Sequence, residues 1–424
     1  MKSLASEKTV TLKPKCFGGT VAAPPSKSAV HRLLICAAAS EEQTRIRCAA
    51  VSEDIEATMR CLHALGADIV VRGEYITVKS GLRRGGTAVC DCGESGSTLR
   101  FMLPLAAALG TEAEFIGKGR LSKRPIKPLC DAMSGSGVEF SGECLLLKIK
   151  GSMKSGSFSV RADVSSQFIT GLLLALPLCG GESEIFLEGR AVSAPYIDIT
   201  TDIQKKFGVN IAKTETGYKI KGQKYVSPRE ISAEGDYSNA AFWFVSAAAA
   251  EKPVRCTGLD PETKQGDREI ISVLRSMGAD VKESGTEVTV TPGRLHAAEI
   301  DGENIPDLIP VLSVAACRAI GKTVIKNTAR LRQKESDRVE STVRLIRALG
   351  GKISAGENYM EIEGCGTLRG GTAEACGDHR IAMSAAAASV FCENEVTIIG
   401  ADAVNKSYPT FFEEFDKLGG GVVK

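Results

Sequence analysis

A polar opening followed by an Ala- and Leu-rich stretch recurs six times along the chain, at intervals of about 70 residues. The copies start at Ser26, Ser95, Ser165, Asp236, Pro306 and Gly377, and the first reads SKSAVHRLLICAAAS. A repeat of this length is typical of a small supersecondary unit that cannot bury its apolar face alone. We therefore expect six copies of one unit.

A second series of segments keeps step with the first. Each contains a glycine suited to a helix C-cap and then alternating strand-like sequence, as in ALGADIVVRGEYITVKSG. An amphipathic segment such as DIEATMRCLHALG precedes it. Each unit is thus predicted to hold two helices and several short strands. The sixth copy breaks off at Lys424, so the strand-like N-terminal stretch EKTVTLKPKCFGGTVAAP is expected to complete it.

Six units exceed what one hydrophobic core usually holds, which predicts two domains of three units each in a mixed α/β (α+β) chain. The first domain is expected to span residues 22–234, and the second to combine 1–21 with 235–424. The chain would cross between domains near Ala22 and Gly235, with a cleft between the domains.

Composition excludes several classes of protein. No apolar run reaches the roughly 18 residues that a membrane span requires, and the N-terminus turns polar within a few residues. The fourteen cysteines lie singly in apolar contexts, which indicates reduced thiols in a cytoplasm. Cys90 and Cys92 form C-x-C without a second close pair, so no zinc site is predicted. A net charge of +2 argues against nucleic acid.

The helix openings carry an unusual set of side chains. A helix N-terminus favours negative charge, so Lys27 and Arg32 near the start of a predicted helix suggest a bound phosphate or carboxylate. The hydroxyls and amide of VSSQF could form a phosphate cup of neutral donors, although a single serine in this position is usually only a cap. Further cations lie in comparable contexts: Arg124, Lys334, Arg338, Arg380 and Lys406.

From end to end the chain resembles the 5-enolpyruvylshikimate-3-phosphate (EPSP) synthase family of enolpyruvyl transferases. The matching blocks are PSKSAVHR, GESGSTLRF, KRPIKPL, VSSQF, VSAPYIDIT, EGDYSNAAF, IPDLIPVL, KESDR, GDHRIAM and NKSYPTFF. The resemblance implies two domains, each an inside-out α/β barrel of three βαβαββ units with inward helices. These domains would close on shikimate 3-phosphate and phosphoenolpyruvate.

The resemblance also implies roles for individual residues. The residues matching the shikimate 3-phosphate site are Lys27, Ser28, Arg32, Ser165, Ser166, Gln167, Ser193, Asp307 and Lys334. The residues matching the phosphoenolpyruvate site are Lys27, Gly96, Arg124, Gln167, Arg338, Arg380 and Lys406. The first domain would serve shikimate 3-phosphate, and the second would complete the phosphoenolpyruvate site.

The implied reaction transfers an enolpyruvyl group to the 5-hydroxyl of shikimate 3-phosphate by addition and elimination through a tetrahedral intermediate, releasing phosphate. Asp307 matches the family's base, and Glu335 or Lys27 would carry the proton to the methylene carbon. The resemblance implies small-molecule substrates only, with no metal, organic cofactor, nucleic acid or membrane, and a monomer.

The chain departs from the family pattern at three positions. Glu94 and Arg330 stand where many or some members have Asn, and Phe101 stands where proline is common, which leaves the response to the inhibitor glyphosate open. A rival assignment is the sister transferase acting on UDP-N-acetylglucosamine. That family has a reactive cysteine before its Arg-Pro, whereas EFIGKGRLSKRPI has none. A non-catalytic repeat scaffold is the other alternative, and 5% aromatic residues argue against its nucleic-acid form.

Overall fold

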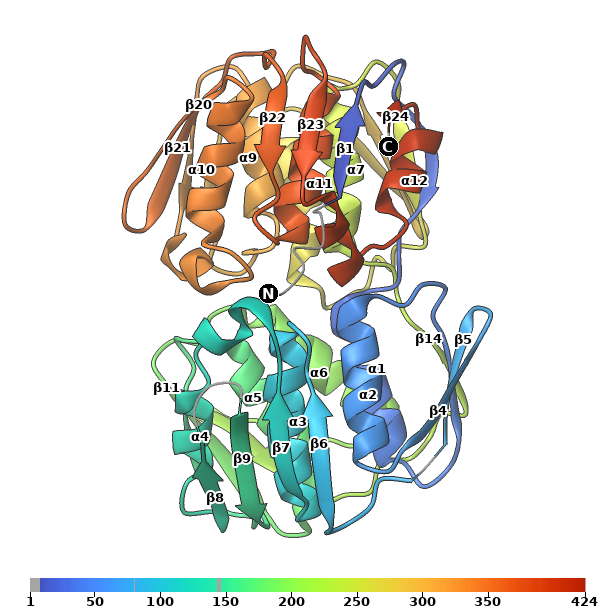
Figure 1. Cartoon of the computed structure of the whole chain (residues 1–424), viewed down its shortest axis with the longest axis vertical. Coiled ribbons are helices and arrows are strands. Elements are labelled where there is room, and N and C mark those ends of the chain that lie inside the picture. Colours follow the sequence, from blue (N-terminus) through green and yellow to red (C-terminus); the bar gives the residue numbers. More distant parts are fainter. Residues whose placement is uncertain (1–7, 80, 143–145, 424) are drawn as a thin grey trace, which may run out of the picture. The chain divides into compact units, whose positions relative to one another are not determined.

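The structure is a computed structural model that describes residues 8–79, 81–142 and 146–423. These residues divide into two compact units, which Figure 1 shows in sequence colours. One unit comprises Pro25–Ala233, and the other joins the residues up to Pro24 with those from Glu234 onward. No helix in the described ranges has both the length and the apolar character needed to cross a bilayer.

The unit Pro25–Ala233 contains three four-stranded sheets with a common plan, in which a parallel pair is followed by two antiparallel neighbours. In sheet order, the first consists of β14 (Glu230–Ser232), β3 (Thr44–Arg47), β5 (Tyr75–Lys79) and β4 (Asp68–Arg72). The second consists of β6 (Thr87–Asp91), β7 (Glu112–Ile116), β9 (Leu146–Gly151) and β8 (Val138–Ser141). The third consists of β10 (Ser157–Arg161), β11 (Ser183–Glu188), β13 (Gly217–Ile220) and β12 (Ala212–Lys213).

The other unit repeats this plan three times. Its first sheet consists of β2 (Gly19–Ala22), β15 (Val254–Thr257), β17 (Glu287–Thr291) and β16 (Asp280–Ser284). The second consists of β18 (Glu299–Asp301), β19 (Lys322–Lys326), β21 (Tyr359–Glu363) and β20 (Lys352–Ala355). The third consists of β22 (Gly371–Glu374), β23 (Val396–Ile399), β1 (Thr9–Leu12) and β24 (Val422–Val423).

The N-terminal stretch completes two sheets rather than one. β1 lies between β23 and β24, with Val10 opposite Ile398, so the prediction that the chain start completes the sixth copy is confirmed. The N-terminal stretch also contributes to the fourth copy, which the sequence did not predict, because β2 pairs in parallel with β15 of that copy. Four sheets take their parallel edge strand from the segment directly before their own first helix, whereas β2, before α1, pairs with β15, and β14, before α7, pairs with β3.

Two α-helices follow each of the six openings, as predicted. In Pro25–Ala233 they are α1 (Lys27–Ala39), α2 (Glu53–Ala64), α3 (Gly96–Leu109), α4 (Lys127–Met133), α5 (Ser166–Ala175) and α6 (Pro195–Lys206), with 3-10 turns η1 (Gly119–Lys123) and η2 (Leu176–Cys179). In the other unit they are α7 (Tyr237–Ala249), α8 (Ile270–Ser276), α9 (Ile309–Arg318), α10 (Arg338–Ala348), α11 (His379–Ser389) and α12 (Phe411–Lys417), with η3 (Gly266–Glu269), η4 (Ala329–Gln333) and η5 (Ala401–Lys406).

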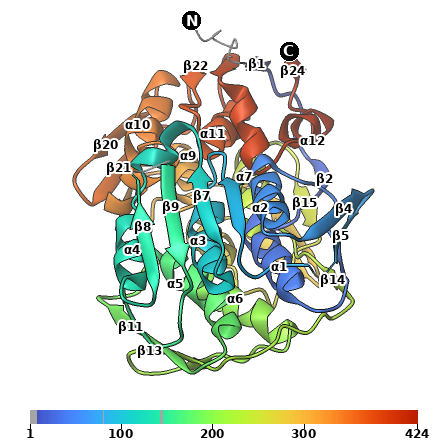
Figure 2. The same ribbon diagram turned by 60° about the horizontal axis from the view of Figure 1, so that its bottom comes forward.

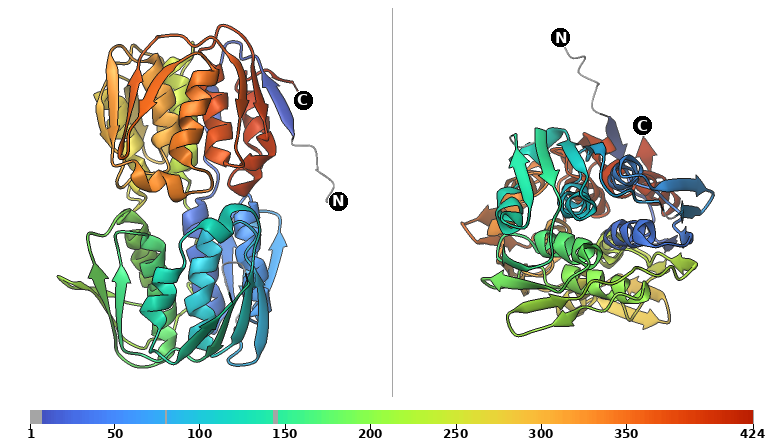
Figure 3. Two further views of the ribbon diagram at one scale, coloured as in Figure 1. Left: turned by 60° about the vertical axis from the view of Figure 1, so that its left-hand side comes forward. Right: turned by 90° about the horizontal axis from the view of Figure 1, so that it is seen from below.

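The Ala-rich helices form the core of each unit because they are buried on all sides. In α7 every residue from Tyr237 to Ala248 is buried, and α5 is buried from Phe168 to Ala175. A helix that is apolar all round must lie inside its domain. Figure 2 and the right panel of Figure 3 show strands at the periphery of Pro25–Ala233 and helices within. Gly171 lets α5 lie so close to α3 that an added Cβ would collide with the carbonyl of Arg100.

Candidate functional site

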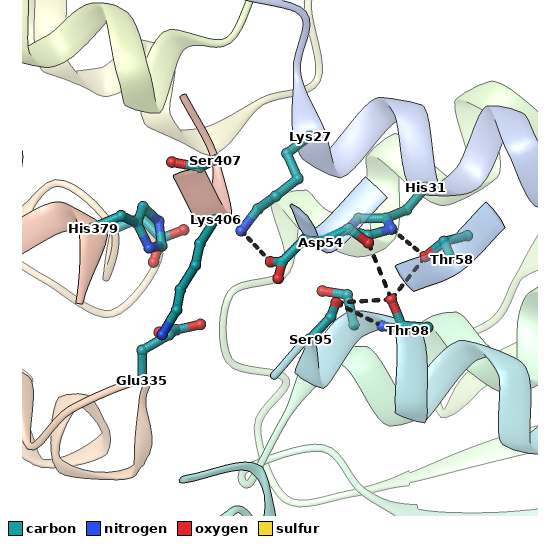
Figure 4. Close-up of polar contacts among 12 residues, drawn as sticks. Lys27, His31, Asp54, Thr58, Ser95, Thr98, Glu335, His379, Lys406 and Ser407 are labelled. Carbon is teal, nitrogen blue, oxygen red and sulfur yellow. Dashed lines mark hydrogen bonds and ion pairs between the residues drawn. The ribbon is translucent and has the colours of Figure 1, made fainter. Parts of the chain in front are cut away.

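The opening of α1 holds a lysine paired to a carboxylate. Ser26 caps the helix by accepting from the Ala29 amide, and Lys27 is the first helical residue. Its Nζ lies 2.8 Å from Oδ2 of Asp54, near the start of α2, as Figure 4 shows. Both side chains are 14% exposed. The predicted anion beside Lys27 is therefore supplied, at least in part, by the protein.

Arg32 lies one turn further along α1 and is buried. Its guanidinium donates to Oγ1 of Thr200 at 2.8 Å, to the carbonyl of Ser28 at 2.5 Å and to the carbonyl of Tyr196 at 2.9 Å. Burial lowers the pKa of Arg32 to about 10, which leaves it cationic at neutral pH. Because these acceptors are neutral, Arg32 keeps a net positive charge that suits a phosphate.

The opening of α3 depends on glycine. Ser95 caps the helix by accepting from the Thr98 amide, and Gly96 is its first residue. A Cβ on Gly96 would lie 2.6 Å from Cζ of Arg124, so the guanidinium packs directly over this position. The side chain of Glu94 lies against Gly119 in the same way. Gly96 and Arg124, which the family resemblance assigns to one substrate, are therefore neighbours.

The opening of α5 is tied to α3 through Gln167. Its amide Nε2 donates to Oγ of Ser97 at 2.9 Å, and its Oε1 accepts from Arg100 at 2.5 Å. Ser165 caps the helix by accepting from the Gln167 amide, and Ser166 is its first residue.

Ser193 lies in a strained turn before α6. It is buried and has a φ of 51°, in the left-handed region. A non-glycine residue in that region costs about 1–3 kcal/mol and is concentrated at functional turns. Ser193 of VSAPY thus places a hydroxyl just before α6, as Ser165 of VSSQF does before α5.

In the other unit, cations converge on one carboxylate. Oδ1 of Asp307 accepts from Arg338 at 2.8 Å, and Oδ2 accepts from Arg380 at 2.9 Å. Nζ of Lys334 lies 3.8 Å from Oδ1. Asp307 precedes α9, Arg338 begins α10 and Arg380 is the second residue of α11, so the fifth and sixth copies of the repeat together supply these groups.

Burial and charge oppose each other at this cluster. Burial raises the pKa of Asp307, but the positive charges of Arg380, Lys334 and Arg338 outweigh it and hold that pKa well below its usual range. Burial lowers the pKa of Lys334 to about 8, and the charges of Arg338 and Arg330 add to this, against Asp307 and Glu335. Asp307 is therefore ionised at neutral pH, and the ammonium group of Lys334 loses its proton near pH 8.

Arg338 binds two further carboxylates. Its Nε donates to Asp378 at 2.9 Å, and another guanidinium nitrogen donates to Glu335 at 2.6 Å. Burial opposes the charge on Arg338, but Asp378, Glu335 and Asp307 raise its pKa above the usual value. Lys406 donates to the carbonyl of Gly377, the residue before Asp378, at 2.6 Å. Glu335 and Lys406 thus lie at the openings of α10 and α11.

Sequence reasoning missed the partners of the predicted residues. Asp54 binds Lys27, Asp378 binds Arg338, Ser238 accepts from Arg380 at 2.9 Å, and Arg100 donates to Gln167. A signal existed for Asp378, since it lies inside the quoted motif GDHR, where it caps α11. None existed for Asp54, because its segment reads as an ordinary amphipathic helix.

Comparison with known proteins gives consistent matches. A family model described as EPSP synthase (3-phosphoshikimate 1-carboxyvinyltransferase) matches residues 12–415. A 3-phosphoshikimate 1-carboxyvinyltransferase of Clostridium kluyveri is 41% identical over 420 residues, which cover 98% of both chains. One from Clostridium perfringens is 42% identical and covers 97% of this chain and 99% of its own length.

Solved structures show the same fold. An EPSP synthase from Acinetobacter baumannii matches with a TM-score of 0.82 at 24% identity, covering 98% of this chain and 99% of that one. The enolpyruvyl transferase NikO from Streptomyces tendae matches with a TM-score of 0.76 at 17% identity, covering 98% of each chain. At these identities the likeness concerns the mixed α/β fold.

Proposed function

This chain belongs to the EPSP synthase family, and from that premise we propose that it is a 3-phosphoshikimate 1-carboxyvinyltransferase. It transfers the enolpyruvyl group of phosphoenolpyruvate to the 5-hydroxyl of shikimate 3-phosphate and releases inorganic phosphate. The observation that carries the proposal is the match to relatives of that name over nearly the whole chain. The cation cluster around Asp307 supports it, because both substrates are anionic.

The architecture of the proposal follows from the six repeats. Residues 22–234 form a three-repeat domain for shikimate 3-phosphate, and 1–21 with 235–424 form a second that completes the phosphoenolpyruvate site. Each domain is an inside-out barrel of three βαβαββ units. The six sheets with one common plan and the buried Ala-rich helices support this description.

Shikimate 3-phosphate is held by neutral donors and by cations. Ser28, Arg32, Ser165, Ser166 and Ser193 supply hydroxyls and one buried guanidinium near helix openings. Neutral donors can surround a phosphate without repelling one another, and Arg32 adds charge. Lys27, Gln167, Lys334 and Asp307 complete the set.

Phosphoenolpyruvate, with a phosphate and a carboxylate, is bound by the remaining cations. Arg124 packs over Gly96, while Arg338 and Arg380 donate hydrogen bonds to the carboxylate of Asp307. Lys27, Gln167 and Lys406 complete the set. These cations stabilise the charge that develops on the departing phosphate, and one preorganised donor of this kind is worth about 3 kcal/mol.

Asp307 acts as the base toward the 5-hydroxyl. Its low pKa makes it a weak base while Arg338 and Arg380 are directed at it. When the anionic groups of phosphoenolpyruvate bind those guanidinium groups, part of their positive charge is neutralised, so the pKa of Asp307 rises toward the working pH. Substrate binding therefore activates the base. As Asp307 takes the hydroxyl proton, the 5-oxygen bonds to C2 of phosphoenolpyruvate and Glu335 or Lys27 protonates the methylene carbon, which yields the tetrahedral adduct. Loss of a proton from the new methyl group, together with cleavage of the bond to phosphate, then gives the enolpyruvyl product and inorganic phosphate.

A steady-state assay of phosphate release tests the proposal. With shikimate 3-phosphate and phosphoenolpyruvate the protein should turn over, and with UDP-N-acetylglucosamine in place of the shikimate it should not. Turnover with only the UDP-sugar would replace the proposal by the sister transferase activity. Steeply salt-dependent nucleic-acid binding without any turnover would favour the scaffold alternative.

A further inference from the structure

A buried chain of hydrogen bonds links three helices of the unit Pro25–Ala233, starting at His31. Nδ1 of His31 lies 2.7 Å from Oγ1 of Thr58 on α2, which lies 2.8 Å from Oγ1 of Thr98 on α3. The Thr98 hydroxyl reaches the Asp54 carbonyl at 3.4 Å and Oγ of Ser95 at 2.8 Å. Figure 4 shows this chain beside the pair of Lys27 and Asp54.

Counting hydrogens gives the chain a direction. Thr98 is the donor toward both Asp54 and Ser95, so its single hydroxyl hydrogen is shared between those two acceptors and none is left for Thr58. Thr98 must therefore accept from Thr58, and Thr58 in turn must accept from His31. The imidazole is thereby assigned as the tautomer with its hydrogen on Nδ1.

The other ring nitrogen has the opposite character. Nε2 of His31 is buried, and no polar atom in the described part of the chain lies within hydrogen-bonding distance of it. The ring meets Phe101 edge-on, with centroids 6.3 Å apart. A proton on Nε2 would be buried without an acceptor.

The surrounding charges also disfavour protonation. Burial, followed by the charges of Lys27 and Arg32, lowers the pKa of His31 well below its usual value. The charged groups on its own helix are thus both cations. The elements packed against it present Thr58 from α2 and Thr98 and Phe101 from α3, all uncharged, while the carboxylate of Asp54 is directed at Lys27.

We propose that His31 is a positioning residue for this reaction: a permanently neutral imidazole that, through Thr58 and Thr98, fixes Asp54 and the α3 opening relative to Lys27. The inference rests on the proposed function, since Lys27 is assigned there to both substrates. His31 lies four residues after Lys27, so the two share a face of α1. Its hydrogen-bond chain ends at the backbone of the residue that binds the Lys27 ammonium and at the cap before Gly96.

Two substitutions break the chain at different links. His31→Leu removes the donor, and Thr58→Val removes the relay hydroxyl with little change in shape. Because small displacements of reacting groups are costly, each should lower kcat by about 10- to 100-fold, with KM for either substrate changed less than threefold. The double variant should be no worse than the poorer single variant, because one pathway is lost in each case.

The conservative variant His31→Asn distinguishes positioning from packing. The amide nitrogen of Asn can occupy the place of Nδ1 and donate to Thr58, although Asn fills less of the core than Leu. We expect His31→Asn to restore kcat to within about threefold of the parent chain. Better activity of His31→Leu than of His31→Asn, or fully additive losses in the double variant, would overturn the proposal. His63→Asn, on the exposed face of α2, is the matched control.

A readout independent of turnover separates this inference from the proposed function. Nitrogen-resolved NMR of the full chain should show the His31 ring neutral from pH 5 to 8, with its hydrogen on Nδ1. Titration near 6.5, the ordinary value for histidine, or a hydrogen on Nε2 would refute the inference whatever reaction the protein catalyses. Failure of the phosphate-release assay alone, with this signature present, would refute the proposed function.

Discussion

The two units present their candidate site residues in different chemical settings. In Pro25–Ala233, Arg32 donates to hydroxyls and carbonyls, and Lys27 pairs with the carboxylate of Asp54. In the unit containing Glu234 onward, Arg338 alone donates to three carboxylates, those of Asp307, Glu335 and Asp378. The same repeat thus supports a largely neutral hydrogen-bonded cup in one unit and an ion network in the other.

This difference explains why the pKa values of the candidate site residues are perturbed to different extents in the two units. Buried hydroxyls and carbonyls satisfy a cation without adding charge, so the guanidinium of Arg32 keeps its net positive charge. In the second setting, burial raises the pKa of Asp307, but the charges of Arg380, Lys334 and Arg338 outweigh it and lower that pKa. Burial lowers the pKa of Lys334 to about 8. Perturbed carboxylate and ammonium pKa values are a mark of catalytic groups. The contrast supports the proposal that the carboxylate in the second setting, Asp307, takes part in proton transfer.

The largest expected effect is on Asp307. Asp307→Ala removes the proposed base and should lower kcat by about 10²- to 10⁴-fold, while affinity for shikimate 3-phosphate measured by calorimetry changes much less. Steady-state phosphate release gives the rate. Equal losses of turnover and affinity would show that Asp307 serves binding, and the contrast between the units would then fail.

Stability should distinguish the two buried arginines. Arg338→Ala leaves Asp378 buried without its cation and should cost about 3–5 kcal/mol of unfolding free energy. Arg32→Ala loses hydrogen bonds to neutral groups only and should cost about 1–3 kcal/mol. Chemical denaturation of both variants measures the difference, and a larger loss for Arg32 would reverse our interpretation.

A substitution at Gly96 tests the site residues of the unit Pro25–Ala233. Gly96→Ala places a methyl group where Arg124 lies, so the guanidinium must move and KM for phosphoenolpyruvate should rise about tenfold. Gly293→Ala is a suitable control, because its φ is ordinary and the nearest atom lies 3.8 Å from the added Cβ. An unchanged KM in Gly96→Ala would separate Arg124 from that substrate.

We expect the titration of Lys334 to have a moderate effect on the pH dependence of kcat/KM. The pKa of its ammonium in the folded chain is about 8, so kcat/KM for shikimate 3-phosphate should fall several-fold above pH 8 as the charge is lost. Lys334→Arg should move this fall to higher pH. Because the folded pKa lies below the unfolded one, the unfolded chain binds more protons between about pH 8 and 10.5, and Lys334 makes the unfolding free energy rise with pH there. If the parent chain and Lys334→Arg gave the same pH profile of kcat/KM, the fall above pH 8 would not be due to Lys334.

The smallest expected effect concerns the two units together. If both supply residues to one reaction, shikimate 3-phosphate should reduce the radius of gyration measured by small-angle scattering. An unchanged radius at saturating ligand would argue against domain closure. The monomeric state and a cytoplasmic location stay predictions from the sequence.

Much of the fold could be predicted because it is written locally and repeatedly. The openings at Ser26, Ser95, Ser165 and Asp236 lie where the structure places helix caps, since a hydroxyl or carboxylate accepts the free amides of the first turn. The pairing of β2 with β15 could not be predicted, because a four-residue strand carries no mark of its distant partner.

Residue order along the chain specifies which residue types stand at each helix opening, and therefore that cations and hydroxyls gather there. Their partners depend on how distant segments pack: Asp54 for Lys27, Asp378 for Arg338, and Thr58 for His31. Capping and amphipathic spacing act within a few residues, where sequence order is enough. Charge pairing and proton placement depend on distances between groups 27 to 40 residues apart in the chain, and packing alone sets those distances.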